Sequence, residues 1–108
     1  MEIPAIPGPG SRPYQEFLRS RHLSAGVYRL QEGATDSQQP HSEDEIYYVL
    51  SGRGMFTAGV KTVEVEAGMC LFVPACEPHR FHSITEALEV LVVFGPAEGS
   101  GSESAETG

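Results

Sequence analysis

A run of ionisable residues stands where an apolar segment of the chain begins. His41 lies four residues before Glu45, and the next five residues, Ile46 to Leu50, are apolar or aromatic. Residues of the same parity share one face of an extended strand. The polar residues of odd number here are Gln39, His41, Glu43 and Glu45. Burying them is costly unless a partner such as a divalent cation satisfies them. The alternative is a solvated strand entrance with acids at its rim.

A second segment, from Gly68 to His82, carries further candidates and reads GMCLFVPACEPHRFH. Together the two segments resemble the motifs of the cupin superfamily, G-x5-H-x-H-x3,4-E-x6-G and G-x5-P-x-G-x2-H-x3-N. The matching residues of the first motif are His41, Glu45 and Gly52, with Gln39 in place of the first histidine. Those of the second motif are Gly68, Pro74 and His79, with Cys76 replacing the glycine and Ser83 the asparagine. The resemblance covers about residues 26 to 94.

The resemblance implies a small β-barrel in which side chains of both motifs hold one divalent transition metal. Carried over residue by residue, the ligands are His41, Glu45 and His79, with Gln39 in place of a fourth, histidine, ligand. Two neutral imidazoles and one carboxylate leave open coordination positions, which is typical of Fe²⁺ sites, although Zn²⁺, Mn²⁺ and Ni²⁺ accept the same donors. The alternative is a metal-free cupin in which these side chains form hydrogen bonds across the barrel.

Two residues are candidates for orienting a bound molecule, and thus for a catalytic role. Tyr47 shares the parity of Glu45, so its hydroxyl either donates toward a substrate or packs in the core. Gln39 either coordinates the metal or contacts the substrate. We favour the second role, because an amide oxygen is a weaker donor than imidazole. Gln38 takes this position if the strand entrance bulges.

Other residues of these types are expected outside the site. Glu43 is interpreted as a solvated acid at the rim, and Cys76 as a turn residue near the barrel mouth. Cys70 is interpreted as a small core residue. His82 has the opposite parity to His79, so we expect it to face outward.

The elements that position these residues are expected to be strands, because the segments between glycine and proline breaks are short and rich in β-branched and aromatic residues. The predicted segments are Val27–Gln31, Glu45–Leu50, Met55–Thr57, Thr62–Val65, Met69–Val73, His79–Ile84 and Leu88–Phe94. This spacing predicts an all-β fold, a small antiparallel barrel or jelly roll. Ser51 to Gly54 is expected to form a hairpin turn, and Gln15 to His22 can hold one turn of helix.

The chain of 108 residues is expected to form a single domain with extensions at both ends. Residues 1–20 are predicted to be an extended N-terminal arm, since residues 1–13 hold four of the eight prolines. Residues 21–96 are predicted to be the barrel. Residues 97–108 contain only Gly, Ser, Ala, Thr and Glu, which predicts a disordered acidic tail.

The charge of the chain argues against two classes of partner. Seven basic and fifteen acidic residues give a net charge of −8, whereas nucleic acids and anionic membranes require a basic surface. No apolar stretch approaches the ~20 residues of a membrane helix, and the N-terminus lacks the pattern of a signal peptide. Two cysteines are too few for a disulfide scaffold, so we expect a cytoplasmic protein.

These features predict a metal-binding protein that acts on a small organic molecule, with oxygenase, isomerase and cyclase chemistry all open. A non-catalytic module that binds or senses a small molecule or a metal is the alternative. Strand edges and apolar residues near the arm, such as Phe17 and Leu18, favour a homodimer.

Overall fold

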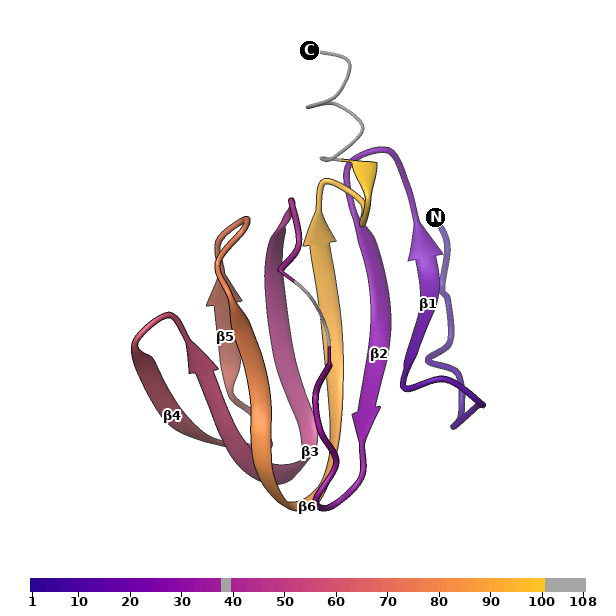
Figure 1. Cartoon of the computed structure of the whole chain (residues 1–108). Coiled ribbons are helices and arrows are strands. Elements are labelled where there is room, and N and C mark those ends of the chain that lie inside the picture. Colours follow the sequence, from indigo (N-terminus) through magenta and orange to yellow (C-terminus); the bar gives the residue numbers. More distant parts are fainter. Residues whose placement is uncertain (38–39, 101–108) are drawn as a thin grey trace.

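Figure 1 shows the computed structural model, in which antiparallel strands form one curved sheet. The structure describes residues 1–37 and 40–100. The strands are β1 (Tyr14–Arg19), β2 (Ser24–Leu30), β3 (Asp44–Ala58), β4 (Lys61–Glu66), β5 (Cys70–Val73) and β6 (His79–Gly95). The predicted all-β antiparallel fold is therefore confirmed. The described residues include no helix able to cross a membrane.

The long strands β3 and β6 pair along their length and build two layers. The first half of β3 pairs with the end of β6 and with β5, and its second half pairs with the start of β6 and with β4. The register between β3 and β6 shifts between Val49 and Met55, and such irregularities bend strands. The two halves face each other, because the ring of Tyr47 in the first half lies 5.0 Å from that of Phe81 at the start of β6.

The prediction of a hairpin turn at this bend is wrong. Ser51 to Gly54 lies inside β3 and is not a hairpin turn. Gly52 adopts a φ of +96°, and a Cβ on it would lie 2.2 Å from the carbonyl oxygen of Ala87, so only glycine fits. A similar merger joins two predicted segments in β6, so the seven segments correspond to five strands.

The remaining strand, β1, was not predicted. The helical turn predicted in this region is wrong. The backbone of Tyr14–Arg19 pairs with β2. The ring of Tyr14 lies against Gly26, where its atoms come within 2.3 Å of the position that a Cβ would take. It also meets Phe94 edge-on at 6.3 Å between ring centres. Strand pairing and burial of this ring outweigh the weak local helix preference.

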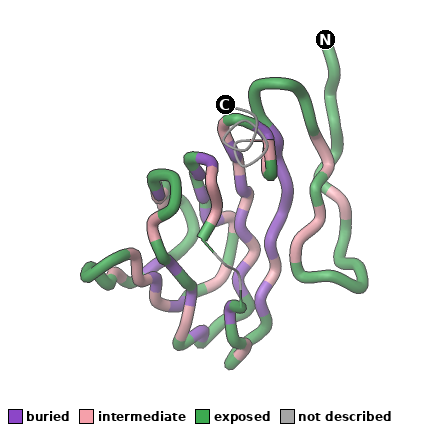
Figure 2. Tube along the Cα trace, turned by 45° about the horizontal axis from the view of Figure 1, so that its top comes forward, coloured by how far each residue is buried: buried purple, intermediate pink, exposed green. Residues whose placement is uncertain are grey.

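The core lies between the layers, and Figure 2 shows the nearly continuous burial of β2 beside the alternating burial of the second half of its neighbour β6. Tyr47 and Val49 are fully buried, which confirms the predicted parity of β3. Cys70 is exposed, so its assignment to the core is wrong. The inward positions of β5 belong to Leu71 and Val73, which pack in or against the core.

The segments before β1 and directly after β6 are both attached to the sheet. The guanidinium of Arg29 donates to the carbonyl oxygen of Pro7 at 2.6 Å and so holds the N-terminal segment. At the other end, Ala97 is only 2% exposed. The first residues of the segment assigned to the tail therefore pack on the domain, whereas residues 101–108 lie outside the described residues.

Candidate functional site

Three polar side chains meet in the interior between the two layers. Nε2 of His79 lies 3.0 Å from Oε1 of Glu45 and 3.0 Å from the hydroxyl oxygen of Tyr47. Glu45 and Tyr47 are two residues apart on β3 and so share its inner face, while His79 begins β6 in the facing layer. All three are buried, Glu45 to 1% exposure. The structure thus brings together three residues that the sequence singled out.

The ring orientation of His79 is set by its other nitrogen. Nδ1 lies 2.8 Å from the carbonyl oxygen of Glu77, and a carbonyl only accepts, so Nδ1 carries a proton and donates it. In the neutral imidazole, the lone pair of Nε2 then points at Glu45 and Tyr47. Histidines that bind metals commonly donate their second N–H to a backbone carbonyl in this way.

The carboxylate of Glu45 is deeply buried and lacks donors. Neither oxygen accepts a hydrogen bond from the described residues, although Oε1 is at ion-pair distance from His79. A neutral His79 has no proton on Nε2 to offer, so only a charged imidazole satisfies Oε1. A buried carboxylate without donors is destabilising by several kcal/mol. The pair therefore fits a positively charged partner, either a proton on Nε2 or a metal ion between the two groups.

The pKa of His79 responds to this environment. Burial by itself lowers the pKa, but the Glu45 carboxylate, the Glu77 carbonyl and the charge of Asp36 outweigh it and raise the pKa above the ordinary histidine value. The metal-free pair thus tends to hold a proton that a metal ion must displace.

His41, the third ligand implied by the resemblance, lies close to this pair without joining it. Its ring centre is 6.2 Å from that of His79, whereas two imidazoles on one tetrahedral metal stand roughly 5 Å apart. Nδ1 of His41 faces Glu98, with 3.6 Å between Nδ1 and Oε2. Within residues 1–37 and 40–100, no three His, Cys, Asp or Glu side chains are grouped so as to hold a metal ion. Glu45 and His79 are in contact, and His41 needs a movement of about 1 Å to join them.

The other residues considered in the sequence analysis lie outside the Glu45–His79 pair. Gln39 and its rival Gln38 lie outside the described residues. Glu43 is not a solvated rim acid: it is 2% exposed, and the hydroxyl of Ser42 donates to its Oε2. Cys76 is exposed in a turn with a φ of +66°, as expected of a residue in place of glycine. His82 contacts Thr57 and Ser83 and takes no part in the Glu45–His79 pair.

Sequence reasoning missed Asp36, a buried carboxylate that joins the segment after β2 to strands β2 and β6. Its carboxylate accepts a 2.6 Å hydrogen bond from the Tyr28 hydroxyl and a 2.9 Å bond from the amide of Phe81. Burial and this hydrogen bond raise the pKa of Tyr28. Asp36 precedes the site by several residues and lies in no motif, so only the tertiary structure shows its role.

Two cavities adjoin His41. One of about 380 Å³ is lined by aromatic and polar residues, among them Arg12, Tyr14, Tyr28, His41, Phe94 and Glu98. Another of about 350 Å³ is lined by Ser42, Glu43 and Cys76 and shares His41 and Glu98 with the first. Both fall in the size range of small-molecule sites. The His41–Glu98 contact therefore lies between two spaces that can admit a small ligand.

The comparisons with known proteins agree with the observed fold. The cupin domain family matches residues 26–94. An uncharacterised protein of Streptomyces coelicolor is 52% identical over 85 residues, covering 79% of this chain and 81% of that protein. A crystal structure of an RmlC-like cupin with a double-stranded β-helix fold from Methanocaldococcus jannaschii superimposes with a TM-score of 0.76 at 14% identity, over 89% of this chain and 91% of that one.

A larger protein shares the same domain. The DMSP lyase DddQ from Ruegeria pomeroyi matches with a TM-score of 0.66 at 26% identity. The match covers 70% of this chain but only 39% of the lyase.

Proposed function

The chain belongs to the cupin family, and from that premise we propose that it binds one divalent transition metal in its barrel and acts there on a small organic molecule. The observation that carries this proposal is the buried Glu45 carboxylate, which has no donor among the described residues and lies 3.0 Å from Nε2 of His79. A carboxylate and an imidazole so placed are suitable donors for Fe²⁺, Zn²⁺, Mn²⁺ or Ni²⁺.

Glu45 and His79 would hold the metal together with His41, and Gln39 would orient the bound molecule. When bound, such an ion supplies Lewis-acid chemistry, and O₂ chemistry if it is iron. Tyr47 has a distinct role in this proposal. When His79 is neutral and metal-free, the Tyr47 hydroxyl donates to its Nε2, and with a metal on that nitrogen the same O–H would donate to the molecule in the barrel instead. Tyr47 is thus the proposed proton donor.

The place for the substrate is the cavity of about 380 Å³ beside His41. The aromatic residues Tyr14, Tyr28 and Phe94 provide its apolar wall, and Arg12 and Glu98 provide charged groups at its edge. A compact molecule with one polar or charged end fits such a lining. The likeness to a lyase supports turnover over simple binding. We place this activity in the cytoplasm.

Metal binding is tested on the full chain purified without added metal. We expect elemental analysis or titration with Zn²⁺ to show one equivalent per chain, and chelator to lower the melting temperature. At a free metal concentration of 100 times Kd, binding stabilises by about 2.7 kcal/mol, or roughly 10 °C for a domain of this size.

The matched control is His82→Ala, since His82 contacts only Thr57 and Ser83 in the hydrogen bonds of the described residues. This variant should bind Zn²⁺ as the wild type does. A wild type that binds no divalent ion and melts identically with chelator contradicts the metal proposal. Turnover that persists in chelator would favour metal-independent chemistry, and metal binding without any turnover would favour the sensing module.

We also propose that the protein is a homodimer, with the outer face of β3 and β5 against a second copy. Ile46 and Phe72 pair across these strands and are 42% and 63% exposed, and Tyr48 beside them is 42% exposed. The N-terminal segment, held at Pro7 beside β2, offers the exposed Ile3 and Ile6 as further apolar residues. A monomer gains nothing from such a contiguous apolar face.

Phe72→Glu should convert this dimer to a monomer in sedimentation velocity, because it places a charge in the interface. Val60→Glu is the matched control, since Val60 is fully exposed in the turn between β3 and β4. If Phe72→Glu sediments as the wild type does, this face is not the interface.

A further inference from the structure

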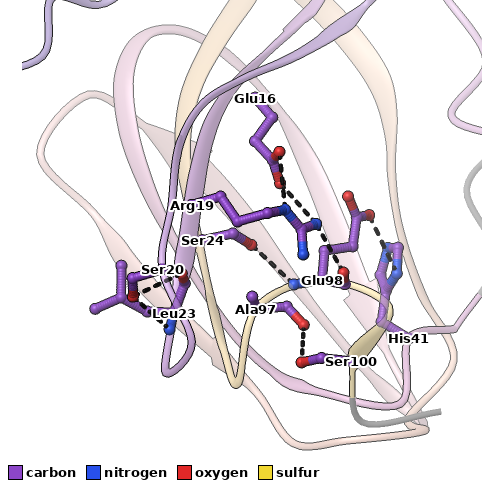
Figure 3. A network of polar contacts seen from close by, with 9 residues as sticks. All are labelled: Glu16, Arg19, Ser20, Leu23, Ser24, His41, Ala97, Glu98 and Ser100. Atoms are coloured by element: carbon purple, nitrogen blue, oxygen red, sulfur yellow. Dashed lines mark hydrogen bonds and ion pairs between the residues drawn. The ribbon is translucent and has the colours of Figure 1, made fainter. Parts of the chain in front are cut away.

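The backbone of Glu98, just after β6, is fixed by two strands. Its amide donates to the hydroxyl of the buried Ser24 on β2 at 2.9 Å. Its carbonyl accepts a hydrogen bond from Nη2 of Arg19 on β1 at 2.8 Å. The preceding Ala97 is buried, and its carbonyl accepts bonds from Ser100. Figure 3 shows this network converging on one short segment. The direction in which the Glu98 side chain leaves the backbone is therefore set.

That side chain points at His41. Oε2 of Glu98 lies 3.6 Å from Nδ1 of the imidazole, and the contact is visible at the right of Figure 3. On another side, the ring of His41 meets Phe94 at 4.7 Å between centres, with an interplanar angle of 66°. The backbone of His41 is held as well, because its carbonyl accepts a 2.6 Å bond from the amide of Cys76. The imidazole thus lies between a carboxylate and an aromatic ring.

In both histidines of the proposed site Nδ1 faces an oxygen, within hydrogen-bond distance for His79 and at ion-pair distance for His41. Nδ1 of His79 donates to the carbonyl of Glu77, and Nδ1 of His41 faces the carboxylate of Glu98. An acceptor beside Nδ1 places the proton on that nitrogen and leaves Nε2 as the coordinating atom.

We propose that Glu98 is the positioning residue of His41, fixing its tautomer so that Nε2 coordinates the metal. This inference rests on the proposed metal site. It also gives Arg19 and Ser24 a function, because they hold Glu98 through its backbone. The site is then completed by a segment beyond the last strand, outside both sequence motifs.

The test compares wild type, Glu98→Ala and Glu98→Gln in the full chain. Zn²⁺ affinity is measured by competition with a chromophoric chelator, and the tautomer of His41 by the ¹⁵N shifts of its ring without metal. We expect Glu98→Ala to weaken Zn²⁺ binding by about 10- to 100-fold and to shift the His41 proton away from Nδ1. Glu98→Gln, which keeps a neutral acceptor, should restore part of both. The metal-free melting temperature should stay near that of the wild type, because the contacts that fix this segment are made by the backbone of Glu98.

Glu16→Gln is the matched control, since Glu16 accepts two hydrogen bonds from Arg19 in the same network. It should leave both Zn²⁺ affinity and the His41 tautomer unchanged. Unchanged or tighter Zn²⁺ binding in Glu98→Ala would overturn the inference, as would an unchanged tautomer. If the wild type binds no Zn²⁺, the proposed function fails, and the ¹⁵N measurement still decides whether Glu98 positions His41.

Discussion

Replacing Glu45 by glutamine is expected to stabilise the metal-free protein and at the same time to abolish its stabilisation by metal. Alkaline pH favours the neutral ring of His79, and at about pH 8.5 the buried Glu45 carboxylate lacks a hydrogen-bond donor among the described residues. Removing an unpaired buried charge while keeping the shape of the side chain should raise the free energy of unfolding by about 1–3 kcal/mol. Because the neutral amide is a weak ligand, added Zn²⁺ should no longer raise the melting temperature.

The sign should reverse in acid. Near pH 5.5 the imidazole of His79 is protonated and pairs with Glu45 across 3.0 Å, so Glu45→Gln then removes the partner of a buried cation and destabilises the fold. Thermal melts with chelator at both pH values, and with Zn²⁺ at the higher one, measure the three effects.

Glu43→Gln is the matched control for Glu45→Gln. Glu43 is also a buried glutamate and stands two residues before Glu45, but it accepts a hydrogen bond from Ser42. Its replacement should not stabilise the metal-free protein, and it should leave the Zn²⁺-dependent shift in place. A Glu45→Gln protein that is less stable at pH 8.5 and still responds fully to Zn²⁺ would show that Glu45 is satisfied by other means and is not a ligand.

The inner face of the site could be predicted from the sequence because it depends on strand parity. Two-residue periodicity alone puts Glu45, Tyr47 and Val49 on one face of β3, and all three are buried. The parity of residues within one strand does not predict which residues of the facing layer lie opposite that strand. The approach of His79 to within 3.0 Å of Glu45 and Tyr47 followed only from the family resemblance.

The errors have a common physical origin in contacts between distant parts of the chain. Gly52 is typical of a turn by local rules, but its positive φ serves a bend forced by the close approach of Ala87. Glu43 is a rim acid by position, yet the folded chain leaves it only 2% exposed. Glu98 stands in a segment whose composition predicts disorder, and it is held by Arg19 and Ser24, more than seventy residues earlier.

Protonation of His79 and metal binding should each stabilise the fold, but at opposite ends of the pH range. The pKa of His79 in the folded, metal-free protein is raised above its ordinary value of about 6.5, despite the opposing effect of burial. Protonation of this ring therefore stabilises the metal-free fold. That contribution is fully present below about pH 6.5 and is lost as the pH rises through the higher folded pKa.

With chelator present, the melting temperature is thus expected to fall as the pH is raised from about 6.5 toward 8.5. The metal requires the neutral ring, so its stabilising effect should be largest at the upper end of this range and nearly absent near pH 5. His79→Ala should flatten the chelator curve over this range and remove the Zn²⁺-dependent shift at every pH. His82→Ala should retain both features, since its ring contacts Thr57 and Ser83 rather than Glu45. A Zn²⁺-dependent shift that is equally large at pH 5 and pH 8.5 would mean that the ion binds without displacing a proton from His79, and the proposed ligand set would then be wrong.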